Sequence, residues 1–138
     1  MSLKSRLIVG ISGASGAVYG VRLLQALQDL PVETHLVMSK AAEMTLAYET
    51  EFRAKDVRAL ADHWYPVADV GAAISSGSFQ TLGMIVAPCS VRSMAEIVDH
   101  SVGRVLDLLG IESGLVKRWG ESPARPRRPV KPAPKKRR

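Results

Sequence analysis

The chain has 138 residues, of which 46% are hydrophobic, and it carries a formal net charge of +6. This length allows one domain with a real core, and the longest apolar runs are only strand-sized, which excludes a membrane-spanning helix. The single cysteine excludes an internal disulfide, and no signal-peptide pattern is present, so we expect a cytoplasmic protein.

The positive charge is concentrated near the C-terminus. Residues 117–138 contain ten basic residues and one acid, so they carry +9 and leave the rest of the chain at −3. Five of the eight prolines also lie there. Because this composition buries too little apolar surface to offset chain ordering, we predict that residues 120–138 form a disordered basic tail. The tail has no aromatic residue to stack on bases, which favours a solvated extension over a nucleic-acid contact.

The N-terminal segment has the pattern of a βα unit. An apolar run at 6–11 is followed by a turn of small residues at 12–16 and then by a helix over 17–29. The turn brings backbone N–H groups and the hydroxyls of Ser12 and Ser15 to a helix N-terminus, which is an anion-binding arrangement. A ligand that carries a phosphate is therefore expected at this turn.

A second strand and helix follow. The run at 33–38 predicts a strand, and Ser39 is placed as the N-cap of a helix over 40–48. Beyond this helix the periodicity is weaker. We predict an aromatic loop at 63–66, while residues 72–74 are compatible with a short edge strand.

The apolar run at 83–88 predicts a third strand. A helix is expected from about residue 91 to 109, interrupted by Gly103 and stopped by Gly110. Strands that alternate with helices predict an α/β fold with a parallel sheet. Three strands are few for a doubly wound sheet, which usually has five or more.

Three serine-containing turns are expected at one edge of this sheet, outside the carboxyl ends of the strands, where open α/β folds bind ligands. They are Ser12-Gly13-Ala14-Ser15, Ser39-Lys40 and Cys89-Ser90-Val91-Arg92-Ser93. Singly, each is an ordinary cap or a close-packed turn. Together they gather hydroxyls and helix N-termini with no carboxylate among them, which favours a phosphate or nucleotide pocket. The glycine fingerprint of dinucleotide sites and the Walker lysine are both absent, which argues against those two classes.

Several other residues keep two interpretations. Arg92 can pair with a phosphate bidentately or lie in solvent, and Glu49 can be an acid/base group or a surface carboxylate. Cys89 is better explained as a small packed residue than as a nucleophile, since no histidine lies near it in the sequence. No metal is expected, because metal-ligand spacing is absent among the three histidines, His35, His63 and His100.

With these motifs in place, the chain resembles the UbiX-type flavin prenyltransferases, formerly described as aromatic-acid decarboxylase subunits. The matching segments are VGISGASGAVYGVRLL at 9–24, ETHLVMSKAA at 33–42, AYET at 47–50, ISSGSFQTLGMIVAPCS at 74–90, VGRVLDLLGI at 102–111 and RWGE at 118–121. They cover most of residues 1–119, which we predict to be one FMN-binding flavoprotein domain.

The resemblance implies a flavodoxin-like or Rossmann-like open parallel sheet with helices on both faces, in a protein that binds FMN and forms a homo-dodecamer. It implies transfer of a dimethylallyl group from its phosphate to N5 and C6 of reduced FMN. The product then serves a partner decarboxylase, as in ubiquinone biosynthesis. The implied catalytic residues are Glu49 and Ser15, with Trp119 in the substrate site. The implied flavin-binding positions are Gly13, Ala14, Ser15, Ser39, Ser90, Val91, Arg92 and Ser93.

The chain departs from the family pattern after Ile97. Members of the family continue with a helix, an arginine-bearing segment and another buried strand, whereas here residues 94–97 run almost directly into a segment that resembles the final helix. The resemblance therefore implies internal shortening near 97–100, with loss of at least one strand and of the arginine, lysine and tyrosine that hold the allylic phosphate. A poor catalyst is expected. The alternative is a non-catalytic flavin- or nucleotide-binding module that co-assembles with an intact paralogue.

Overall fold

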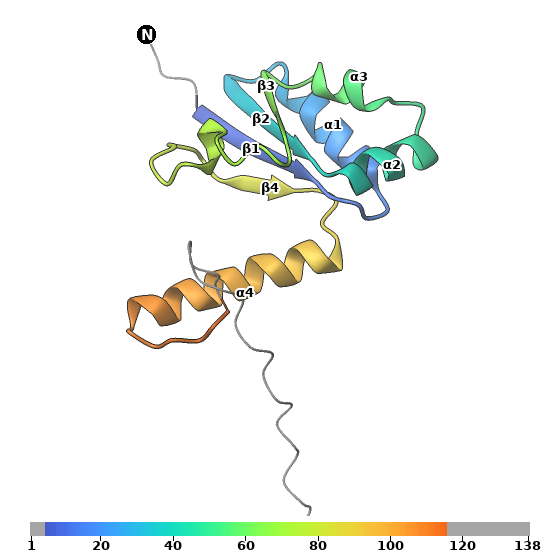
Figure 1. Cartoon of the computed structure of the whole chain (residues 1–138). Coiled ribbons are helices and arrows are strands. Elements are labelled where there is room, and N and C mark those ends of the chain that lie inside the picture. Colours follow the sequence, from blue (N-terminus) through green and yellow to red (C-terminus); the bar gives the residue numbers. More distant parts are fainter. Residues whose placement is uncertain (1–4, 116–138) are drawn as a thin grey trace, which may run out of the picture. The chain divides into compact units, whose positions relative to one another are not determined.

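The structure, a computed structural model, describes residues 5–115, and the chain divides into two compact units, residues 1–95 and 96–138. The first unit contains one sheet of four parallel strands in the order β3-β2-β1-β4 (Figure 1). The strands are β1 (Ser5–Ile11), β2 (Val32–Met38), β3 (His63–Pro66) and β4 (Met84–Val86). The open parallel sheet predicted from the sequence is confirmed.

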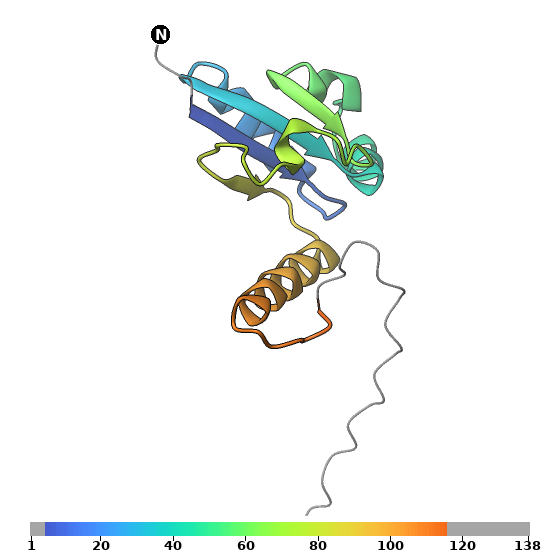
Figure 2. The ribbon, with the colours of Figure 1, turned by 60° about the vertical axis from the view of Figure 1, so that its left-hand side comes forward.

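Strand β1 lies inside the sheet, and its two neighbours differ in length. All seven of its residues pair with β2, from Ser5 opposite Val32 to Ile11 opposite Met38. Only three of its residues pair with β4. Figure 2 shows β1 and β2 running side by side, with the short β4 on the far side of β1. The carboxyl ends of β1 and β2 therefore meet at one edge, where the first two serine-containing turns begin.

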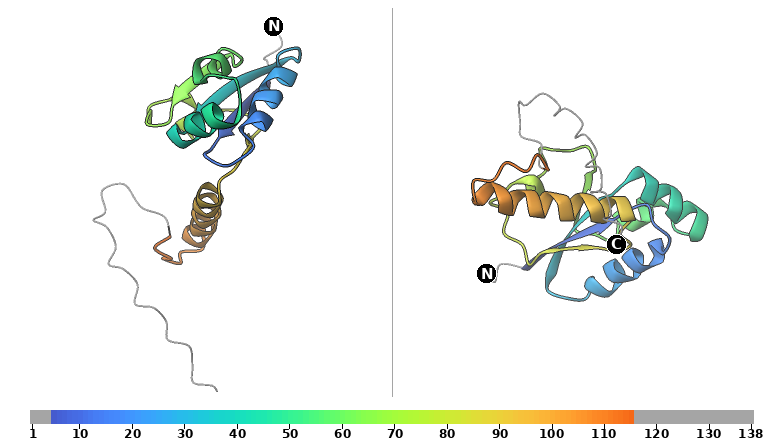
Figure 3. Two further views of the ribbon diagram at one scale, coloured as in Figure 1. Left: turned by 90° about the vertical axis from the view of Figure 1, so that its right-hand side faces the viewer. Right: turned by 90° about the horizontal axis from the view of Figure 1, so that it is seen from below.

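The main core lies between the sheet and three helices, α1 (Ala17–Leu27), α2 (Lys40–Glu49) and α3 (Ala54–Arg58). Alternate residues of the strands point to this side because the side-chain period of a strand is two. Helices α1 and α2 also contact each other (Figure 3). The buried residues of this core are Val9, Ile11, Ala17, Val21, Leu24, Leu27, Leu36, Met38, Ala42, Leu46 and Val57.

The opposite side of the sheet is polar near the start of β2. His35 is buried there, and the ring of Phe79 meets it edge-on with 5.0 Å between ring centroids. Phe79 belongs to the segment that follows a single 3-10 turn, η1 (Ala73–Ser75). This segment, rather than a strand, covers that part of the sheet in the described chain.

Two local predictions before β4 are wrong. Residues 63–66 form strand β3, because they pair in parallel with β2. The neighbouring strand, rather than the local residue pattern, makes this segment a strand. Residues 72–74 do not form an edge strand. Instead the backbone N–H of Ser75 donates to the carbonyl oxygen of Ala72 at 2.9 Å, which closes the 3-10 turn η1.

Helix α4 (Val91–Leu108) begins in the first unit and continues into the second. It runs unbroken through Gly103, so the predicted interruption is wrong: a glycine inside a helix costs about 1 kcal/mol relative to alanine but does not remove a hydrogen bond. The predicted stop at Gly110 is confirmed, since its φ is +73° and the N–H of Ile111 donates to Leu106. The predicted tail at 120–138 lies outside the described residues.

No helix in residues 5–115 combines the length and the apolar character that crossing a membrane requires.

Candidate functional site

The turn after β1 is tied to the turn after β4 through Ser12. The Ser12 hydroxyl donates to the carbonyl oxygen of Pro88 at 2.9 Å and accepts the backbone N–H of Ser90 at 2.6 Å. The backbone N–H of Ser12 donates to the same Pro88 oxygen at 3.1 Å. Since Ser12 is buried, these bonds fix the positions of the first and third serine-containing turns relative to each other.

The same turn packs against the start of α2 through Gly13. A Cβ atom placed on Gly13 would lie 2.3 Å from the Cβ and 3.2 Å from the Cα of Ala41. Only glycine therefore allows the two backbones to approach this closely. The N–H of Ser39 also donates to the carbonyl oxygen of Ile11 at 3.1 Å, so the second turn joins the other two.

Two of the three turns cap helices with serine hydroxyls. The hydroxyl of Ser39 accepts the N–H of Ala42 at 3.1 Å, which confirms the predicted N-cap of α2. At the start of α4, the hydroxyl of Ser90 accepts the N–H of Ser93 at 3.2 Å and donates to the Ser93 hydroxyl at 2.9 Å. Arg92 is exposed in this first turn of α4. Each cap leaves other N–H groups of its helix start directed at the same edge of the sheet.

The N-terminus of α1 is capped by a carboxylate rather than by a serine. One oxygen of Glu49 accepts the N–H of Gly16 at 2.8 Å and the N–H of Ala17 at 3.3 Å. The Ser15 hydroxyl also hydrogen-bonds this carboxylate. Together with the two N–H groups it holds the pKa of the Glu49 carboxyl below its usual range, so the group is ionised near neutral pH.

This contact corrects one expectation about the turns. They were predicted to gather without a carboxylate, but Glu49 is the last residue of α2, and α2 contacts α1, so its side chain reaches the turn at 12–16. Glu49 is exposed, and its carboxylate is engaged with the start of α1 rather than left in solvent alone. An acid/base role stays a prediction. The anion-binding arrangement predicted for the start of α1 exists, and in this structure the chain itself supplies the anion.

Cys89 was predicted to be a small packed residue, and that prediction is wrong. Its thiol is exposed, because β4 ends three residues earlier and the chain leaves the sheet there. Trp119, the predicted substrate-site residue, lies outside the described residues.

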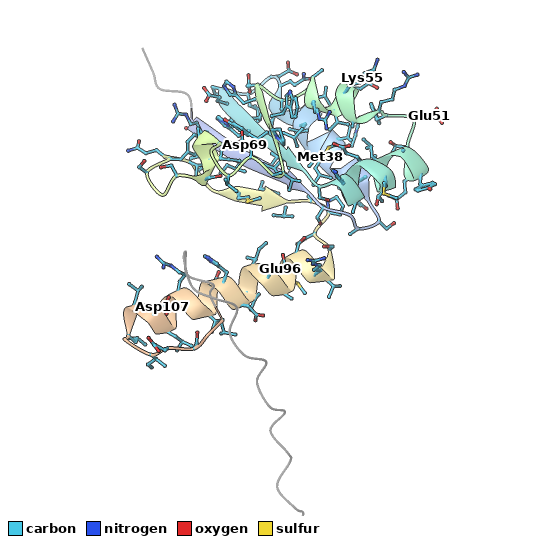
Figure 4. The ribbon with its side chains drawn as sticks, viewed as in Figure 1. Met38, Glu51, Lys55, Asp69, Glu96 and Asp107 are labelled. Carbon is cyan, nitrogen blue, oxygen red and sulfur yellow. The ribbon has the colours of Figure 1, made fainter. Side chains whose placement is uncertain are left out.

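A cavity of about 290 Å³ opens at the carboxyl ends of β2 and β3. Its lining includes Met38, labelled in Figure 4, together with Lys40 and Trp64. The Arg58 guanidinium lies 4.5 Å from the centroid of the Trp64 ring and pairs with Glu43. The cavity adjoins the second turn through Lys40, but none of its lining residues belongs to the first or third turn. The three turns therefore form a hydrogen-bonded surface beside this cavity.

The sequence placed Ser12 in the first turn but did not show that it joins this turn to the third. Its position directly after a strand was the available signal. Glu33, His35 and His63 come together on the polar side of the sheet, and nothing in their spacing along the chain indicated it.

Comparisons with known proteins agree with this geometry. A family model described as Flavoprotein matches residues 1–103. The chain is 52% identical over 126 residues to flavin prenyltransferase UbiX of Escherichia coli strain K12, an alignment that covers 91% of this chain and 61% of the relative. It is 61% identical over 97 residues to the Salmonella typhimurium strain LT2 protein of the same name, covering 70% and 51%. The chain thus spans about three fifths of the length of the first relative and about half of the second.

Solved structures show the same likeness. The dodecameric FMN-dependent UbiX-like decarboxylase of Escherichia coli O157:H7 superposes with a TM-score of 0.67 at 54% identity, over 75% of this chain and 60% of that one. AnUbiX (PadA1), solved in complex with FMN and dimethylallyl pyrophosphate, superposes with a TM-score of 0.61 at 31% identity, over 87% of this chain and all of that one. The chain therefore belongs to the Flavoprotein family and, within it, to the UbiX-type proteins.

Proposed function

We propose that the chain binds FMN at the surface made by its three serine-containing turns and acts as a flavin prenyltransferase, transferring a dimethylallyl group from its phosphate to reduced FMN. The observation that carries the proposal is the joining of the three turns through Ser12 and Gly13, with the Glu49 carboxylate held beside them. A generic α/β fold needs none of these contacts.

The groups present at the turns suit FMN. A flavin phosphate needs N–H and O–H donors, and the starts of α2 and α4 supply backbone N–H groups beside the hydroxyls of Ser39, Ser90 and Ser93. Because Glu49 already occupies the start of α1, we assign the phosphate to the other two helix starts and to Arg92. The remaining positions that we assign to FMN are Gly13, Ala14, Ser15 and Val91.

Reduced FMN, when bound, supplies the nucleophilic ring atoms that accept the prenyl group. The proposed role of Glu49 is to accept a proton beside the reacting edge of the flavin. Its lowered pKa keeps the carboxylate ionised near neutral pH, and its contacts with Gly16 and Ala17 fix its direction. The proposed role of Ser15 is to position that carboxylate, since its hydroxyl donates to Glu49. Trp119 would complete the substrate site.

The wider parts of the proposal rest on the relatives. Dimethylallyl phosphate is the proposed co-substrate, since AnUbiX was solved with dimethylallyl pyrophosphate. We propose that the chain forms a homo-oligomer, specifically a dodecamer, because the UbiX-like decarboxylase is dodecameric. We further propose a cytoplasmic location and delivery of the prenylated flavin to a partner decarboxylase.

FMN binding is tested first by quenching of flavin fluorescence. Arg92→Gln is expected to weaken binding about 10- to 100-fold, which corresponds to one charge-assisted hydrogen bond of about 1.5–3 kcal/mol. Arg104→Gln, a change further along the same helix, is the matched control and should bind FMN as the unchanged chain does. Equal affinity of the two variants would remove Arg92 from the site.

Transfer is tested by mixing reduced FMN with dimethylallyl phosphate under anaerobic conditions and following the flavin absorption spectrum. Glu49→Gln should bind FMN but abolish the spectral change. If the unchanged chain binds FMN and yields no product, the transferase proposal fails for this chain and the binding proposal stands.

The second candidate is a non-catalytic flavin-binding module that co-assembles with an intact paralogue. Exposed apolar side chains favour it: Met84 is 55% exposed and Ile85 40% exposed on β4. Within the described residues β4 has a neighbouring strand on one side only. Co-purification with an intact relative, flavin binding and no turnover alone would support this candidate. Turnover by the isolated chain would exclude it.

A further inference from the structure

Three side chains with metal-binding atoms meet on the polar side of the sheet. Nε2 of His35 lies 2.9 Å from Oε1 of Glu33, and Nε2 of His63 lies 3.7 Å from the same oxygen. The three candidate ligand atoms all lie within 4.8 Å of one another. These separations are close to those between ligands of a single bound ion, whose bonds to nitrogen and oxygen are about 2.0–2.2 Å.

The sheet register produces this group. His35 of β2 is directly opposite His63 of β3, and in a parallel pair such residues project to the same side. Glu33 lies two positions before His35 and so shares that side. The two imidazole rings stack with 4.8 Å between centroids. All three ligands thus stand on strands, which hold their positions more firmly than loops do.

Tyr65 gives His35 the outer partner that metal-binding histidines usually have. Its hydroxyl lies 3.0 Å from Nδ1 of His35, the ring nitrogen that does not face Glu33. A tyrosine hydroxyl can donate or accept, so it can accept from Nδ1–H and leave Nε2 unprotonated toward an ion. Such a partner fixes the tautomer and orientation of the ring. His35 is 3% exposed, which further restricts its rotation.

We propose that Glu33, His35 and His63 form a binding site for one divalent transition-metal ion of the Zn²⁺ type. Two imidazoles and one carboxylate form a donor set that suits Zn²⁺ and its neighbours better than Mg²⁺ or Ca²⁺, which prefer oxygen ligands alone. The side chain of His63 is half exposed, so an ion can enter from solvent and keep water in its remaining position. The site is independent of the proposed flavin surface, since Glu33 stands near the start of β2 and Ser39 follows its end.

The Arg6 guanidinium competes with a metal ion for the Glu33 carboxylate. Its Nε lies 3.3 Å from Oε1 of Glu33, and its guanidinium lies 5.1 Å from the centroid of the Phe79 ring. Binding of a cation requires the guanidinium to move away from the carboxylate. The Arg6 side chain is 40% exposed and can turn into solvent. Removal of its charge should therefore strengthen metal binding, whereas a plain ion-pair network would give no such gain.

The chain allows a clean test, because its only other strong metal-binding side chains are Cys89 and His100. The reference protein is the full chain with Cys89→Ser and His100→Asn, titrated at pH 7.5 with Zn²⁺ against a chromogenic chelator. We expect one equivalent to bind with a micromolar dissociation constant. Co²⁺ in place of Zn²⁺ should give visible absorption bands of a low-coordinate nitrogen–oxygen site.

Three variants of the reference protein decide the assignment. His63→Asn, at a half-exposed position, should fold and bind at least 10-fold more weakly. Tyr65→Phe should lower the affinity for Zn²⁺ about 10-fold, because it removes only the hydroxyl that contacts Nδ1 of His35. Arg6→Gln should bind several-fold more tightly. Absence of one-equivalent binding by the reference protein, or equal affinity of the His63→Asn variant, would overturn the proposal.

Discussion

The two strands that pair with β1 differ in burial, although each places an apolar residue opposite Val9. Val9 of β1 is paired with Leu36 on one side and with Ile85 on the other. Leu36 is 1% exposed, whereas Ile85 is 40% exposed. The side chains are similar in size and occupy equivalent register positions, so burial here depends on what covers each strand rather than on the residue itself.

The difference indicates on which side of β1 the core is enclosed by the described chain alone. On the β2 side, three helices and seven paired residues enclose a continuous core. On the β4 side, three paired residues leave Met84 and Ile85 exposed. Parallel strands are normally buried on both faces and have paired neighbours on both edges. The resemblance implies the loss of at least one strand after Ile97, and a β4 with exposed apolar side chains agrees with that expectation.

The sharpest test compares truncation of the two neighbours of Val9. Leu36→Ala should lower the free energy of unfolding by about 2–5 kcal/mol, because it removes buried contacts and leaves a cavity. Ile85→Ala should cost about 1 kcal/mol, since much of that side chain is already in water. Urea denaturation measures both. Equal losses would show that β4 is covered in solution, for instance by a second copy of the chain.

The next largest effect concerns the turn after β1, which packs against the start of α2. Gly13→Ala should lower the free energy of unfolding by about 3 kcal/mol, because the new methyl group meets the backbone of Ala41. It should also weaken FMN binding. Gly77→Ala is the matched control, as a Cβ there meets nothing within 4 Å. Its stability should match that of the unchanged chain. Tolerance of alanine at position 13 would mean that the turn stands further from α2.

Ser12→Ala tests the link to the β4 side. It removes two hydrogen bonds of the hydroxyl and leaves the N–H of Ser90 without its acceptor, which should cost about 1–2 kcal/mol. Affinity for FMN should fall with it, because the third turn is then no longer fixed. Ser78→Ala, at an exposed position, is the control. Unchanged FMN binding by Ser12→Ala would show that the β4 side contributes little to the site.

The smallest effect is the pH dependence of the Glu49 contact. Because the folded-state pKa of Glu49 is lowered, its stabilising contribution is complete above the ordinary glutamate pKa of about 4.3 and is lost as the pH falls through the lowered value. The difference in melting temperature between the unchanged chain and Glu49→Gln should be constant from pH 7 to 5 and shrink below that. Glu51→Gln, two residues on and labelled in Figure 4, is the control for loss of one negative charge near this helix end. A difference independent of pH would contradict the contact.

Much of the first unit was predictable because its signals are local. The strand at 5–11, the glycine turn and α1 follow from periodicity, and Ser39 was identified as a cap by its residue type and position. The wrong predictions fall where pairing overrides local signals. β3 is a strand only because β2 offers it a partner, and α4 continues through Gly103 because one weak position does not break a helix.

The sequence by itself therefore determined β1, α1, β2, α2, β4 and α4 in chain order and the positions of the serine-containing turns, because these depend on residues a few positions apart. It did not determine β3. The tertiary structure alone decided which distant groups meet. It brought Glu49 to the start of α1, Ser12 to Ser90, and Glu33 to a pair of histidines on neighbouring strands. Such contacts depend on which strands pair and on how helices pack, and residues a few positions apart in the chain do not specify these long-range arrangements.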